Sequence, residues 1–170
     1  MTRRSKARGQ AMVEFALIFP IFILLLVGMF DLGRVVWVNN TLATAAREAA
    51  RYAIVHGEKS ACPVGPAAAG TEIPTADASC PHPSPSRQGI KDVAHKWAAG
   101  TSADVTVSVC YGVVTTCTGD VDQVSNPVPD TSRGTQVMVT VTSTVGLSLP
   151  SLVGFSGFDL SATSTTLVNH

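Results

Sequence analysis

The chain has 170 residues, enough for about one domain and an appended segment. Its formal net charge is zero, but Arg3, Arg4, Lys6 and Arg8 stand at the start without an acid beside them. The remaining 12 − 4 = 8 basic residues face all 12 acidic ones, so the rest carries 8 − 12 = −4. The basic cluster is short, terminal and without interleaved aromatic residues, which excludes a nucleic-acid-binding profile.

The apolar run behind this cluster has the length of a membrane span. Residues 1–9 are expected to be a disordered basic leader. From Ala11 to Phe30 the chain is apolar except for Glu14, and a helix of that length covers about 30 Å, the thickness of a bilayer core. Flanking basic residues stay cytoplasmic. We therefore expect one span with the N-terminus inside and the body outside.

A removed secretory signal peptide is the alternative interpretation of this run. Such a peptide needs a small-residue cleavage site on its far side, and Val27-Gly28-Met29-Phe30-Asp31 is a poor match. The run is also longer than the apolar part of a typical signal peptide. The sequence therefore favours a retained anchor.

One long helix is predicted for residues 10–56, with Pro20 inside it and Gly57 as its stop. Asp31 and Arg34 are three residues apart on one helical face. We expect them to form an ion pair at the outer membrane surface, near Trp37 as an aromatic anchor. Further along, small and apolar residues form a stripe at helical spacing that permits close packing: Leu42, Ala46, Ala49, Ala50 and Ala53.

Several motifs in this segment agree with one family in order and spacing. They are Arg8-Gly9-Gln10-Ala11-Met12-Val13-Glu14-Phe15, Asp31-Leu32-Gly33-Arg34, Asn40-x-Leu42, and Ala45-Ala46-Arg47-Glu48-Ala49-Ala50-Arg51-Tyr52-Ala53. Over residues 8–55 the chain resembles the TadE-like family, pilin-like components of the tight adherence (Flp-type) pilus machinery. Family members often carry glutamate where Asp31 stands, a tyrosine near Trp37, and glycine where Ala49 or Ala50 stands.

This resemblance implies a function in pilus assembly. A prepilin peptidase would cut between Gly9 and Gln10, and Glu14, the fifth residue of the mature chain, would help to dock the subunit. A carboxylate at bilayer depth costs roughly 2.5–3.5 kcal/mol, and the ammonium freed on Gln10 would offset part of that cost, within one subunit or between neighbours. The alternative is that Glu14 is merely hydrated at the membrane interface and has no role in assembly.

The expected partners are the prepilin peptidase, other pilins, the assembly platform and the lipid bilayer, with no nucleic acid. The expected location is the bacterial cytoplasmic membrane, or the pilus itself. The sequence does not distinguish a filament subunit from an assembly factor, nor does it decide whether Gln10 is N-methylated.

The cysteines are Cys62, Cys80, Cys110 and Cys117. An even number in an exported body suggests disulfides. Three pairings are possible, and proximity favours Cys62–Cys80 and Cys110–Cys117. A metal site using Cys80 and His82 is the alternative, but the sequence has neither C-x₂-C nor H-x₃-H spacing. We therefore expect no metal.

Residues 57–102 are predicted to be a proline-rich loop followed by a short amphipathic helix over 87–99. The loop is a displayed surface, a docking loop or a tolerated insertion. The helix would be capped by Ser86, ended by Gly100, and packed through Ile90, Val93, Ala94 and Trp97.

Residues 103–170 are predicted to be rich in β-strand. Valine alternates with hydroxyl or other residues over 105–109 and 137–141, and 159–168 is a weaker third strand. An apolar stretch, Leu147 to Phe158, is expected to cover the interface between helix and sheet, or alternatively to touch the membrane. Three strands need a covering element, which the outer half of the long helix supplies. The predicted fold is α+β: a pilin-like transmembrane helix that continues into a small extracytoplasmic domain with a short antiparallel sheet.

No catalytic constellation is found in the sequence. It contains no G-x-S-x-G, H-E-x-x-H or Walker loop. An enzyme is therefore not expected, and no cofactor is predicted. A membrane-anchored extracellular binding module or adhesin, with the proline-rich loop as its contact surface, is the alternative to a pilin-like subunit.

Overall fold

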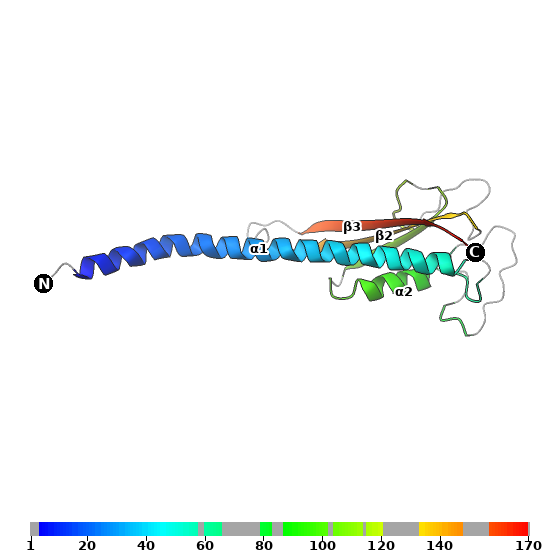
Figure 1. Ribbon diagram of the computed structural model, residues 1–170, viewed down its shortest axis with the longest axis horizontal. Coiled ribbons are helices and arrows are strands. Elements are labelled where there is room, and N and C mark those ends of the chain that lie inside the picture. The colour runs from blue at the N-terminus through cyan, green and yellow to red at the C-terminus, as the bar shows by residue number, and fades with distance from the viewer. Residues whose placement is uncertain are drawn as a thin grey trace. The chain divides into compact units, whose positions relative to one another are not determined.

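The computed structural model describes residues 4–57, 60–65, 79–82, 87–101, 104–113, 115–120, 133–147 and 157–169. In chain order the elements are α1 (Arg4–Val55), α2 (Gln88–Trp97), β1 (Val105–Tyr111), β2 (Gln136–Val145) and β3 (Phe158–Leu167), as Figure 1 shows. The chain divides into two compact units, Met1–Trp37 with Gly146–Phe158, and Val38–Val145 with Asp159–His170. The fold class is α+β, as predicted.

Helix α1 begins earlier than the sequence suggested. The prediction placed its start at Gln10 and left residues 1–9 disordered, whereas the helix starts at Arg4. Arginine, lysine and alanine all favour helix, and a single Gly9 costs only about 1 kcal/mol. The basic segment therefore extends the helix toward the N-terminus. The helix also runs through Pro20 and ends at Val55, one residue before the predicted end.

The second half of α1 contributes a buried stripe to the second unit. Its members are between 0% and 1% exposed: Val38, Leu42, Ala45, Ala46, Ala49, Ala50 and Ala53. The stripe includes every residue that helical spacing predicted for it. Most of its side chains are methyl groups, so the helix axis can lie close to whatever packs on it.

The sheet has the order β1-β2-β3. Strands β1 and β2 are antiparallel with Val105 opposite Ser143, Val107 opposite Val141, and Val109 opposite Val139. Val107, Val109, Val139 and Val141 are between 0% and 6% exposed, and Val105 at the start of β1 is half-buried. These valines lie on the face that the period-2 pattern predicted to be apolar. On the other face, the hydroxyl groups of Thr140 and Thr163 lie 3.0 Å apart and join β2 to β3.

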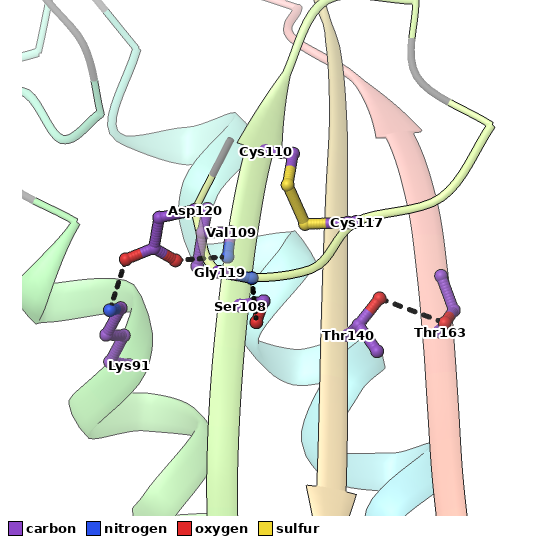
Figure 2. Close-up of a disulfide and its surroundings, with 9 residues drawn as sticks. All are labelled: Lys91, Ser108, Val109, Cys110, Cys117, Gly119, Asp120, Thr140 and Thr163. Carbon is purple, nitrogen blue, oxygen red and sulfur yellow. Dashed lines mark hydrogen bonds and ion pairs between the residues drawn. A yellow bond between two sulfur atoms is a disulfide. The ribbon is translucent and has the colours of Figure 1, made fainter. Parts of the chain in front are cut away.

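The buried face of the sheet and the buried stripe of α1 form one core. Figures 1 and 2 both show the second half of α1 beside the sheet, and both belong to the second unit. This is the covering element that a three-stranded sheet needs. Residues 148–156 of the apolar stretch expected at this interface lie outside the described residues, so that expectation stays a prediction.

Helix α2 packs less completely than predicted. Ile90 and Ala94 are fully buried, but Trp97 is 50% exposed, although Ala98, the next residue, is only 1% exposed. The predicted cap, Ser86, lies outside the described residues. Arg87 occupies the cap position without a side-chain cap hydrogen bond, and the chain leaves the helix region through Gly100 at a φ of 94°.

Candidate functional site: the N-terminal helix and its processing glycine

The predicted processing bond lies inside α1. Gly9 is exposed, and a Cβ atom built on it would meet no other atom within 4 Å. No positive φ is recorded for this glycine, so neither backbone conformation nor packing requires glycine at this position. The fold of the chain therefore gives no reason for glycine at position 9.

Glu14 lies one turn beyond Gln10 on the same helical face, because residues four apart are neighbours on an α-helix. Both residues are exposed. The side chains around Glu14 are apolar, with Met12 78%, Val13 61% and Phe15 64% exposed. The carboxylate of Glu14 thus stands alone on an apolar helix surface, one turn after the bond that is predicted to be cut.

The uncharged run of α1 continues from Phe15 to Phe30. Within the part of the chain that the structure describes, one helix is long and apolar enough to cross a membrane, and none of its most apolar window is buried. The rings of Phe15 and Phe19 stack along it at 5.3 Å between centroids. Since apolar side chains all around a helix need a non-aqueous surrounding, this segment is a single candidate membrane span.

Asp31 and Arg34 stand at the C-terminal end of this span. Asp31 is only 9% exposed. Arg34 donates a hydrogen bond from Nη1 to the carbonyl oxygen of Gly146, with 3.3 Å between the atoms. The predicted ion pair between Asp31 and Arg34 stays a prediction. The predicted aromatic anchor, Trp37, is 52% exposed, as an interfacial indole would be.

A shallow apolar depression lies on α1 above Gly33. It has a volume of about 450 Å³ and is lined by Leu26, Met29, Phe30, Gly33, Arg34 and Trp37. Gly33 resembles Gly9 in that an added Cβ would meet nothing within 4 Å.

The cysteines pair as proximity favoured. Cys62 is bonded to Cys80 and Cys110 to Cys117, with Cα atoms 5.6 Å and 5.7 Å apart. The first bridge joins segments 60–65 and 79–82 on either side of the proline-rich loop, most of which lies outside the described residues. The second bridge sits at the end of β1, where Cys110, Cys117 and Met138 form a small buried cluster.

A polar network beside the second bridge was missed by the sequence reasoning. Asp120 accepts a hydrogen bond from the backbone N–H of Val109 at 2.7 Å and pairs with Lys91 on α2, as Figure 2 shows. The backbone N–H of Gly119 donates to the hydroxyl of Ser108 at 3.0 Å. The turn signal at Gly119 was visible in the sequence, but nothing there indicated that its neighbour would reach β1.

No metal centre is found among the described residues, since none of them form a group of three His, Cys, Asp or Glu side chains that could hold an ion. His82, which the alternative metal site required, pairs instead with Asp92 at 2.8 Å. Its predicted partner ligand, Cys80, is held in the disulfide.

Comparison with known proteins finds a similarity for the N-terminal part of the chain. The family model described as TadE-like protein matches residues 9–51. No curated protein and no solved structure matches the chain. The match begins at the predicted processing glycine and ends near the end of α1, so the resemblance inferred from the motifs is confirmed for this helix. It indicates a pilus-associated, pilin-like protein with a membrane-associated helix.

Proposed function

We propose that this protein is a minor pilin or pseudopilin of a Tad-type pilus. It is anchored in the membrane by α1, and a prepilin peptidase removes residues 1–9. One observation carries the proposal. The TadE-like match starts at Gly9, and Gly9 has no role in the fold, since a side chain there would meet nothing. A glycine without a structural reason at the first matched position supports recognition by a processing enzyme.

Cleavage after Gly9 would change the electrostatics of α1. The helix now starts at Arg4, so Glu14 lies well inside it. After cleavage the helix would start at Gln10, and Glu14 would stand close to the new N-terminus, where the helix dipole and the free α-amine both favour a carboxylate. Processing would thus stabilise the charge that is costly in the membrane.

The positions of the Gln10 ammonium and the Glu14 carboxylate would also fix the depth at which a neighbouring helix docks. The ammonium on Gln10 and the carboxylate of Glu14 lie at nearly the same depth, because one helical turn rises only about 5.4 Å. A neighbouring helix that offers its own ammonium at this depth satisfies the carboxylate of this one. The proposed partners are therefore other pilins and the assembly platform, with the N-terminus cytoplasmic and the sheet outside.

The N-terminal residue of the mature protein tests processing. Mass spectrometry of membrane fractions, with and without a prepilin peptidase, should find Gln10 as the first residue only when the peptidase is present. A chain that retains residues 1–9 under both conditions would contradict the proposal. A chain that begins beyond Asp31 would mean that the apolar run is a removed signal peptide.

Substitution of Glu14 tests docking. Glu14→Ala should insert into the membrane at the normal level but fail to enter purified pili or assembly complexes. Glu14→Gln keeps the shape without the charge and should fail in the same way. The matched control is Glu48→Ala, which removes an exposed ion pair with Arg51 and should assemble normally. Normal incorporation of both Glu14 variants would refute the docking role.

A further inference from the structure

The bond between Gly9 and Gln10 lies within a continuous helix, and this has a consequence for its hydrolysis. We infer that Gly9 serves as a point of local unwinding, so that the prepilin peptidase acts on an opened form of residues 4–13 and the stability of this helical segment sets the cleavage rate. The inference rests on the proposed function, whose peptidase it assumes.

A helical peptide bond is a poor substrate for hydrolysis. Its carbonyl oxygen is engaged by the N–H four residues later, and the turns on either side limit access to the carbonyl carbon. Hydrolysis breaks the C–N bond between Gly9 and Gln10, with water supplying a hydroxyl to the Gly9 carbonyl carbon and a proton to the Gln10 nitrogen. Both events need the backbone to leave the helix first. Proteolysis of such a segment follows the population of its opened form when opening is fast.

Three features make this opened form accessible. Glycine is the weakest helix former after proline. The first turn of α1 contains no acidic residue, so no carboxylate there stabilises the positive end of the helix dipole. Gly9 is also exposed and without neighbours that a side chain would meet, so no packing at this position holds the helix closed.

The rest of α1 is protected from the same opening. The residues beyond Glu14 lie deeper in the apolar span, where an unpaired backbone group has no water to bind. Unwinding is therefore confined to the residues before Glu14. Gly9 is therefore both the residue after which the chain would be cleaved and the residue at which the helix can unwind.

The experiment changes helix stability without touching Gly9. In the full-length protein in lipid nanodiscs, Ala7→Gly and Ala11→Gly flank the bond on its two sides, and Ala16→Gly is the matched control inside the apolar span. Amide hydrogen exchange without peptidase reports opening, and the appearance of Gln10 as N-terminus reports cleavage. Both flanking variants should raise the opened population and kcat/KM by about fivefold, the factor that corresponds to the glycine–alanine difference in helix propensity. Ala16→Gly should change neither.

A compensation experiment separates unwinding from recognition of glycine. Gly9→Ala should slow cleavage at least fivefold, and Ala7→Gly in the Gly9→Ala background should recover about fivefold. The inference is overturned if exchange rises in the flanking variants while kcat/KM stays at the wild-type value, or if neither quantity changes. Failure of the proposed function has a different signature, since the wild-type chain itself would then not be cut after Gly9.

Discussion

The carboxylate of Asp120 accepts a hydrogen bond from the backbone N–H of Val109, with 2.7 Å between Oδ1 and the nitrogen. This N–H points away from β2. The N–H of Gly112 bonds to the carbonyl oxygen of Gln136, and bonding directions alternate along an antiparallel strand. Asp120 thus satisfies an outward-facing donor on β1, and its second oxygen pairs with Lys91 on α2. One side chain thus satisfies a donor at the edge of the sheet and ties α2 to that edge.

Removal of this carboxylate should destabilise the second unit. Asp120→Ala leaves the N–H of the fully buried Val109 without its partner, which should lower the free energy of unfolding by about 1–3 kcal/mol. Asp120→Asn is the control, since asparagine keeps an acceptor oxygen and tolerates the φ of 58°. Urea unfolding of the full-length protein in detergent measures both, and equal stability of Asp120→Ala and the wild type would contradict the assignment.

The two disulfides should differ in their contribution to stability. Chain entropy alone favours the Cys62–Cys80 bridge, which spans 18 residues against 7, by under about 1 kcal/mol. Burial favours the other bridge, since Cys110 and Cys117 are 0% and 4% exposed. We expect the double alanine variant at Cys110 and Cys117 to show the larger fall in melting temperature. The reverse order would show that loop length outweighs packing here.

Tyr52 and Gly89 should be energetically coupled. A Cβ on Gly89 would lie 3.2 Å from Cε1 and 3.3 Å from the hydroxyl of Tyr52, and the Tyr52 ring is stacked on His56 at 3.9 Å, which limits its movement. Gly89→Ala should therefore lose the roughly 1 kcal/mol that alanine gains in a helix.

A double-mutant cycle checks this coupling. In a Tyr52→Ala background the space is open, so Gly89→Ala should stabilise the protein by about 1 kcal/mol. Gly33→Ala, at a position where an added Cβ meets nothing, provides the uncrowded comparison. The same effect of Gly89→Ala in both backgrounds would rule out the proposed crowding.

The predicted ion pair of Asp31 and Arg34 can be measured in the same way. Asp31→Asn, Arg34→Gln and the double variant form a cycle whose coupling energy should exceed that of the exposed pair Glu48–Arg51, for which about 0.3–0.5 kcal/mol is typical. The expected difference arises because Asp31 is only 9% exposed, so water screens its charge less. Thermal unfolding in lipid nanodiscs supplies the four stabilities. Additive effects at positions 31 and 34 would mean that the two side chains do not pair.

The strands show which features of a sheet can be predicted from the period-2 pattern of the sequence. Alternating valines located β1 and β2 and identified their buried face, because side chains alternate strictly across a strand. The pattern did not give the register that places Val109 opposite Val139, since any even shift buries the same face. The exposure of Trp97 was also missed, because helical spacing shows which residues share a face but not which of them the rest of the chain covers.

The course of α1 from Gln10 onward, its apolar span and the motifs that match the TadE-like model could all be predicted from residue patterns, because helix propensity, span length and motif spacing are properties of neighbouring residues. It also indicated the disulfide pairing, since both bridges close short loops. Three facts required the folded chain: Asp120 bonds to the edge of β1, Tyr52 lies where a side chain on Gly89 would be, and Gly9 lies in a helix without a packing role. These facts depend on which distant segments meet, or fail to meet, and local residue patterns do not encode such contacts.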